Sequence, residues 1–205
     1  MNIIFDLDGT LIDSKPRLHQ LFQHLVPEST LSFSEYWDLK FSGLSNETIV
    51  SNQFGFTERA VIEFRREWMD LIESPFFLEM DANFSGMHEA LEVLKGSARL
   101  YVCTARQFVD PVYVQLETLK LLGYFDEVMV TEQRNTKEFL IAQKVPDLSS
   151  DDWMVGDTGK DVQVGIALGI NTCAVLTGFM TADALSRYSP NRILESVTDF
   201  KLFPA

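Results

Sequence analysis

Two aspartates near the start of the chain, Asp6 and Asp8, follow a short apolar run and precede Gly9. In an extended backbone, residues two positions apart point to the same side, so both carboxylates would face one substrate. Crowded carboxylates repel one another, and the pKa of one rises unless a cation offsets the repulsion. A carboxylate beside a divalent cation can form an aspartyl-phosphate while its neighbour transfers protons. Gly9 permits a sharp turn that lets backbone amides approach a phosphate.

A second pair of aspartates, Asp157 and Asp161, lies four positions apart, with glycines before and between them. We expect Asp157 to end a strand and Asp161 to lie in the first turn of the next helix. Oxygen ligands in this arrangement suit Mg²⁺, which usually takes one or two protein carboxylates plus water and substrate oxygens. Taken alone, the pattern is equally compatible with ordinary helix capping.

Two further residues are candidates for holding phosphoryl oxygens. Thr104 follows the apolar run Leu100–Cys103 and offers a hydroxyl donor. Lys137 can neutralise phosphate and carboxylate charge, since lysine is a familiar phosphate partner in the form of a point charge. Lys120 and Lys144 are alternatives for this role.

The elements that would position these residues are short apolar runs typical of buried parallel strands, expected at residues 2–5, 99–104, 127–130, 153–156 and 171–176. Helical patterns lie between the later runs, and this alternation predicts an α/β fold with a doubly wound parallel sheet. In such sheets ligands bind outside the carboxyl ends of the strands. Residues far apart in the sequence are therefore expected to converge there.

Residues 14–84 do not follow this alternation and show successive helical patterns instead. Leu18, Leu21 and Phe22 begin one apolar stripe, and Ser34, Ser45 and Thr57 are expected to cap the next three helices. The sequence therefore predicts a catalytic core made of residues 1–13 and 85–205, with residues 14–84 inserted as a helical cap.

Taken together and in order, these motifs resemble the haloacid dehalogenase-like superfamily: Asp6-Leu7-Asp8-Gly9-Thr10, then Thr104, a lysine, and Gly156-Asp157 followed by Asp161. The resemblance spans nearly the whole chain, and its layout is similar to the phosphoglycolate phosphatase and β-phosphoglucomutase branch. It implies a Rossmann-like core with a helical cap inserted after the first motif. It also implies a phosphatase that acts on a small phosphorylated metabolite with Mg²⁺ as cofactor.

The resemblance also implies a role for each matching residue. Asp6 would be the nucleophile and Asp8 the acid and base. Magnesium would be held by Asp6, the Asp8 backbone carbonyl and Asp157, with support from Asp161. The phosphoryl oxygens would be bound by Gly9, Thr104, Ala105 and Lys137. Candidates for reading the rest of the substrate are Arg17, Lys40, Gly43 and Arg106.

Several alternatives stay open at this point. The substrate could be phosphoglycolate, a sugar phosphate or a nucleoside monophosphate. A phosphosugar mutase and a non-catalytic protein that kept the fold are the rival functions. Asn46 follows Gly43-Leu44-Ser45 where mutases of the branch carry a basic residue, which argues against a mutase. Dehalogenases lack the second aspartate of the first motif, so Asp8 argues against dehalogenation.

The composition narrows the class of partner. The 205 residues carry a formal net charge of -13, which disfavours nucleic acid and anionic membranes as partners. The first residues lack a basic segment followed by a long apolar one, so we expect no signal peptide and a cytoplasmic protein. Cys103 and Cys173 lie in apolar runs and are expected to be buried thiols. The sequence does not predict an oligomeric state.

Overall fold

The computed structural model describes residues 1–202, and the chain divides into two compact units. Met1–Asp13 and the chain from Ala82 onward form the core unit, and Ser14–Asp81 form the helical unit. The chain re-enters the core unit at β3 (Ala82–Asn83), which pairs antiparallel with β2 (Ile12–Asp13). The two connections to the helical unit are therefore held side by side by a short ladder.

Within residues 1–202, six parallel strands form the core sheet in the order β5-β4-β1-β6-β7-β8. From β1 the chain builds the sheet first to one side, through β4 and β5, and then to the other, through β6, β7 and β8. This order confirms the predicted doubly wound sheet. Five of the strands were predicted, with β7 one residue shorter than expected, whereas β8 was not. Their bounds are β1 Asn2–Phe5, β4 Arg99–Thr104, β5 Glu127–Val130, β6 Trp153–Gly156, β7 Asn171–Val175 and β8 Arg192–Leu194.

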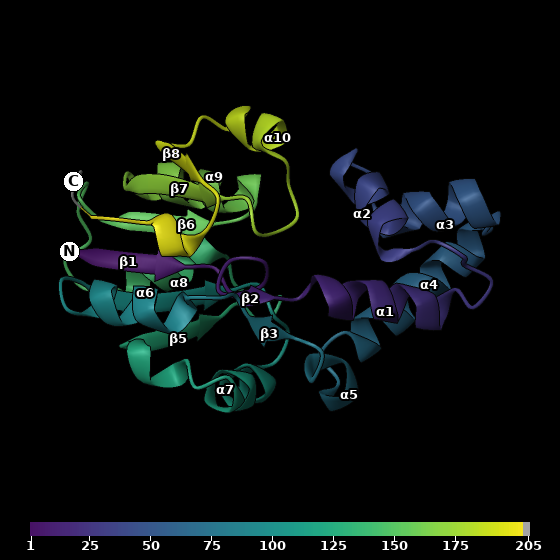
Figure 1. Cartoon of the computed structure of the whole chain (residues 1–205), viewed down its shortest axis with the longest axis horizontal. Coiled ribbons are helices and arrows are strands. Elements are labelled where there is room, and N and C mark those ends of the chain that lie inside the picture. Colours follow the sequence, from purple (N-terminus) through teal and green to yellow (C-terminus); the bar gives the residue numbers. More distant parts are fainter. Residues whose placement is uncertain (203–205) are drawn as a thin grey trace. The chain divides into compact units, whose positions relative to one another are not determined.

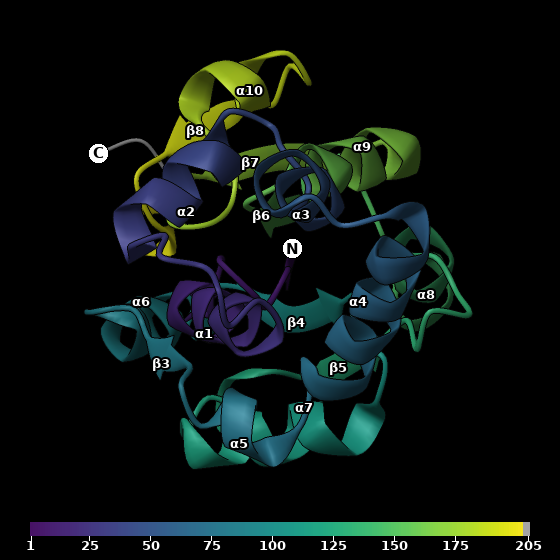
Figure 2. The same cartoon turned by 90° about the vertical axis from the view of Figure 1, so that its right-hand side faces the viewer.

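Helices cover both faces of the sheet (Figures 1 and 2). Ile3 and Phe5 point into a core shared with α6 (Met87–Lys95) and α7 (Val109–Thr118), while Ile4 points into the opposite core. That opposite core is shared with α8 (Lys137–Lys144) and α9 (Gly159–Leu168). The alternation follows from the two-residue period of a strand. The remaining core elements are α10 (Ala182–Ser186), η1 (Leu122–Tyr124) and η2 (Val197–Asp199).

The helical unit contains α1 (Lys15–Leu25), α2 (Phe33–Phe41), α3 (Asn46–Phe54), α4 (Glu58–Leu71) and α5 (Pro75–Leu78). Aromatic rings fill its interior, with Phe22 packed against Tyr36 and Phe64. Ser45 and Thr57 cap α3 and α4 as predicted. The cap of α2 was predicted wrongly, because Ser32 rather than Ser34 accepts from the Glu35 amide in a reciprocal capping box.

None of the helices formed by residues 1–202 has the length and apolar character needed to cross a membrane.

Candidate active site

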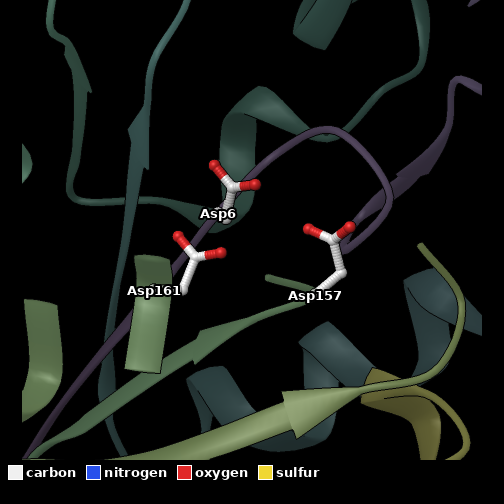
Figure 3. A group of neighbouring side chains, drawn as sticks. All are labelled: Asp6, Asp157 and Asp161. Atoms are coloured by element: carbon white, nitrogen blue, oxygen red, sulfur yellow. The ribbon is translucent and has the colours of Figure 1, made fainter. Parts of the chain in front are cut away.

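Three aspartates from separate segments bring their carboxylates together at the carboxyl edge of the sheet (Figure 3). Asp6 directly follows β1, Asp157 directly follows β6, and Asp161 lies in the first turn of α9. One carboxylate oxygen from each lies within 4.8 Å of the others, and all three residues are buried. The convergence predicted from the strand ends is therefore present, and the cluster could hold a metal ion.

Lys137 inserts its ammonium group among these carboxylates. Its Nζ atom donates to Asp6 Oδ1 at 2.6 Å and to Asp161 Oδ1 at 2.7 Å. The Thr136 hydroxyl caps α8, so the helix begins at Lys137. The cap therefore fixes the backbone position from which the Lys137 side chain extends. Lys144, one of the alternatives, instead pairs with Glu127 on the surface. Lys137 thus supplies positive charge at this edge of a chain whose formal net charge is -13.

The electrostatics of the cluster favour a bound cation. Burial raises the pKa of Asp6 to about 7, opposed by Lys137 and reinforced by the nearby Asp161 carboxylate. Burial also raises the pKa of Asp157 well above its ordinary value, and Asp6 and Asp161 add to that rise. The carboxylates of Asp161 and Asp6 raise the pKa of Lys137 against the effect of burial. One ammonium group leaves three buried carboxylates undercompensated, and a divalent cation would offset the remainder.

Glycine is required at position 9 because of its neighbours. Gly9 has φ +75°, and a Cβ atom there would lie 2.7 Å from Asp157 Oδ2. The Thr177 hydroxyl donates to the Gly9 carbonyl at 2.6 Å, and the Phe179 amide donates to Asp157 Oδ2 at 2.8 Å. The loop after β7 therefore orients Asp157. We did not predict a role for Phe179, because a backbone amide leaves no trace in residue type.

Both oxygens of Asp161 are used by protein donors. Oδ1 accepts from Lys137, and Oδ2 accepts from the Thr158 hydroxyl at 2.6 Å and the Thr158 amide at 3.1 Å. Thr158 and Asp161 form a capping box that starts α9. This arrangement suits an orienting carboxylate that fixes Lys137, and it also fits the expected support of a metal through water.

Thr104 ends β4 and is 2 % exposed, and its carbonyl accepts from the Thr131 amide. Ala105 follows it, and its carbonyl accepts from the Gln133 side chain at 2.8 Å. A pocket of about 450 Å³ opens here, with Ala105 and Lys137 among its lining residues. The two predicted phosphate-binding positions therefore lie at the same edge of the sheet as the aspartate cluster.

Asp8 takes a different position from the other aspartates. Arg106 donates two hydrogen bonds to its carboxylate, from Nε to Oδ2 at 2.6 Å and from Nη2 to Oδ1 at 2.8 Å. The same Nη2 atom donates to Gln115 Oε1 on α7 at 3.0 Å. Gln115 was not predicted as a site residue, since a single glutamine on a helix carries no distinguishing pattern.

The remaining candidates belong to the helical unit. Arg17 is 2 % exposed, pairs with the buried Asp81 at 3.2 Å, and donates to the Ile72 carbonyl at 3.1 Å. Burial lowers the pKa of Lys40, and the nearby Glu47 carboxylate opposes this. Gly43 follows α2 with φ +93° and has open space where a Cβ would be. The Arg17 contacts are those of a residue that ties the two ends of the helical unit together.

The family model described as haloacid dehalogenase-like hydrolase matches residues 3–175. The chain belongs to this family. The match confirms the predicted family and the assignment as a hydrolase. A pyrophosphatase, PpaX of Oceanobacillus iheyensis, is 26% identical over 96% of this chain and 93% of its own. A phosphoglycolate phosphatase of Aquifex aeolicus is 25% identical over 87% of this chain and 85% of its own.

Solved structures share the fold. A haloacid dehalogenase-like hydrolase from Streptococcus pneumoniae has a TM-score of 0.78 at 22% identity, covering 96% of this chain and 94% of its own. A magnesium-bound hydrolase of the family from Bacillus subtilis has a TM-score of 0.65 at 15% identity, again covering 96% and 94%. The α/β fold with helices inserted after β2 is therefore that of the family.

Proposed function

We propose that the chain is a Mg²⁺-dependent phosphatase in which Asp6 takes up the phosphoryl group of a small substrate. The observation that carries this proposal is the cluster of Asp6, Asp157 and Asp161 at the carboxyl edge of the sheet, where the Lys137 ammonium donates to Asp6 and Asp161. Phosphoryl transfer requires a nucleophile together with positive charge for the phosphoryl oxygens. Both requirements meet at Asp6, and the family membership supports the same chemistry.

The donor set fits magnesium. Asp6 and Asp157 offer hard carboxylate oxygens, and the Asp8 backbone carbonyl follows Asp6 closely in the chain. Asp161 would act through an intervening water, since its two oxygens already accept from Lys137 and Thr158. When bound, Mg²⁺ neutralises charge between the nucleophile and the phosphoryl oxygens. The name of the Bacillus subtilis structure, which records bound magnesium, supports this choice of ion.

The proposed reaction uses the chain's own residues in two steps. An oxygen of Asp6 bonds to phosphorus as the bond to the leaving oxygen breaks, and Asp8 gives that oxygen a proton. Asp8 then takes a proton from water, whose oxygen attacks phosphorus and releases phosphate from Asp6. The phosphoryl oxygens would be held during both steps by Thr104, Ala105, Gly9 and Lys137. The membership of the family and the position of these residues at the strand ends support these roles.

Two curated relatives suggest a substrate class. Pyrophosphate carries a second phosphoryl group, and phosphoglycolate carries a carboxylate close to the phosphoester. Their shared chemistry is a transferable phosphoryl group with a second anion nearby. We therefore favour a small phosphorylated metabolite of this kind over a sugar phosphate or a nucleoside monophosphate.

A panel of phosphorylated compounds tests the proposal. Purified protein is incubated with pyrophosphate, phosphoglycolate, a hexose phosphate and a nucleoside monophosphate, with and without Mg²⁺, and released phosphate is measured. We expect Mg²⁺-dependent release and, after acid quench, a phosphoprotein that hydroxylamine cleaves. Isomerisation of the hexose phosphate without net release would indicate a mutase. No release from any compound in Mg²⁺ would contradict the proposal.

A further inference from the structure

The Asp8–Arg106 pair occupies both oxygens of the carboxylate that the reaction needs as an acid. Nε and Nη2 of Arg106 lie 2.6 Å and 2.8 Å from Oδ2 and Oδ1 of Asp8. The Asp8 side chain is 18% exposed and that of Arg106 is 5% exposed, so solvent screens the pair weakly. Bidentate arginine–carboxylate pairs are among the strongest hydrogen-bonded contacts in proteins. Arg106 therefore holds the Asp8 carboxylate firmly in one orientation.

This orientation is not the one in which Asp8 can serve a leaving group. A carboxylate whose two oxygens accept from one guanidinium fork has its more basic, inward-facing lone pairs occupied, and it offers a leaving oxygen only the less basic outward-facing ones. Among the described residues, the carboxylates whose oxygens lie within 4.8 Å of one another are those of Asp6, Asp157 and Asp161, and Asp8 is not part of this cluster. Efficient proton transfer through the more basic lone pairs thus requires the pair to open, and two charge-assisted hydrogen bonds are lost when it does. Something in the reacting complex has to offset that loss.

We propose that Arg106 is a specificity-determining residue that exchanges Asp8 for a second anionic group on the substrate. A carboxylate or a phosphoryl group matches the same planar fork that Asp8 fills. When the substrate brings such a group, Arg106 keeps two charge-assisted bonds, and Asp8 is free to turn to the leaving oxygen. A substrate without a second anionic group has to open the Asp8–Arg106 pair with no new bonds to Arg106 in return. This inference rests on the proposed function and defines which substrates activate its acid.

Gln115 makes the exchange possible without moving the arginine. It is 5% exposed on α7, and its Oε1 accepts from Arg106 Nη2 at 3.0 Å. Because this bond does not involve Asp8, it persists when Asp8 turns away. Gln115 is therefore a positioning residue that keeps the fork in place. The Gln115 amide is neutral, so it leaves the Asp8–Arg106 pair in place. A carboxylate at this position would supply negative charge to Arg106 and weaken its pair with Asp8.

The geometry also limits where the second anion sits. Asp8 reaches Arg106 in one orientation and the leaving oxygen in the other, from a single Cα and a short side chain. Arg106 thus lies close to the leaving oxygen. We therefore expect the second anion to be attached close to that oxygen, as in pyrophosphate or phosphoglycolate. A distant carboxylate would not reach the fork.

Phosphoglycolate and its uncharged carboxamide, phosphoglycolamide, form a matched pair for the test. We expect the wild-type kcat/KM, measured in Mg²⁺, to favour phosphoglycolate by ~10-fold or more. Arg106→Met should bring this preference close to one. Gln115→Glu should also reduce it, by raising the carboxamide rate relative to phosphoglycolate, because a built-in carboxylate at the same Nη2 atom partly neutralises the guanidinium and weakens its pair with Asp8. Lys144→Met, at the surface pair with Glu127, is the control and should keep the wild-type preference.

Pyrophosphate provides a second substrate, in which the second anion is a phosphoryl group. The substrate whose kcat/KM falls more in Arg106→Met carries the anion that Arg106 binds better. Binding to the Asp6→Asn protein, measured by calorimetry, gives a readout that does not depend on turnover. There the carboxylate preference should disappear when Arg106→Met is added. Phosphate release with an unchanged preference in both folded variants would overturn the exchange while leaving the proposed function standing. No release from any substrate would overturn both.

Discussion

The side-chain ammonium of Lys137 lies 2.6 Å from Oδ1 of Asp6, although 131 positions separate the two residues. The contact arises because α8 begins with Lys137 beside the carboxyl end of β1. It couples the proposed nucleophile to the charge that would hold the phosphoryl group.

Replacing Lys137 by methionine should lower kcat/KM by ~10²-fold or more, because the lost charge stabilises phosphoryl oxygens in the transition state. Phosphate release in saturating Mg²⁺ is the measurement. Lys144→Met removes an equal charge at the surface and should retain the wild-type rate. Similar rates for Lys137→Met and the wild type would assign the phosphate lysine elsewhere.

Asp6→Asn should abolish turnover while the fold is retained, since an amide is a poor nucleophile and a poor magnesium ligand. Loss of a catalytic nucleophile commonly costs several orders of magnitude in rate. Circular dichroism establishes that the variant is folded, and phosphate release gives the rate. A folded variant with more than about a tenth of the wild-type kcat would contradict the assignment of Asp6.

The stability of the metal-free protein should fall as pH rises from about 4 to about 7. The pKa of Asp6 rises from 3.8 to about 7 on folding, so the folded state binds more protons than the unfolded state in this window. Stability therefore decreases with pH there, and the full penalty remains above about pH 7. The raised pKa of Asp157 acts in the same direction. Thermal unfolding in EDTA across this range measures the effect.

Magnesium should reverse that trend by compensating the ionised carboxylates. The gain in Tm on adding Mg²⁺ should be larger at pH 8 than at pH 5. Asp6→Asn is the control, and its Tm in EDTA should fall less steeply with pH than that of the wild type. Equal slopes for the two proteins would show that Asp6 ionises without a folding penalty.

The positions of the aspartates were predictable because they depend on short-range signals. An apolar run marks each strand, and parallel strands deliver the residues that follow them to one edge. Arg106 was a candidate for the substrate, but its pairing with Asp8 depends on how β4 and β1 lie next to each other. Its contact with Gln115 depends further on the packing of α7. Pattern and spacing do not encode such choices between side-chain partners.

The helical unit shows the same limit. Arg17 near the start of α1 is indistinguishable, in sequence, from a solvent-facing helical residue or a substrate contact. Its burial against Asp81 follows from the two ends of the insert meeting, which is a property of the whole unit. Local rules placed the starts of α3 and α4, yet they misplaced that of α2 by two residues, because Ser32 and Ser34 are both good caps.

Breaking the Arg17–Asp81 pair should destabilise the protein. Both side chains are at most 2% exposed, and removing one partner of a buried pair typically costs ~3–5 kcal/mol. Asp81→Asn and Arg17→Met are each compared with the double variant by denaturant unfolding. The double variant should be less destabilised than the two single effects combined. Additive single effects would mean that the two residues act independently.

The last prediction concerns the proton that Asp8 would give to the leaving oxygen. Asp8→Asn cannot donate it as a carboxylic acid does, so substrates with poor leaving groups should suffer most. An alkyl phosphate should lose ~10²–10⁴-fold in rate, whereas p-nitrophenyl phosphate, whose leaving group needs little protonation, should lose less in the phosphorylation step. Single-turnover measurements isolate that step from the later attack of water. The amide in Asp8→Asn cannot form the charged pair with Arg106, so Asp8→Glu, which keeps the carboxylate, serves as the matched control and should retain part of the leaving-group discrimination. Equal losses for both substrates in the phosphorylation step would exclude Asp8 as the acid.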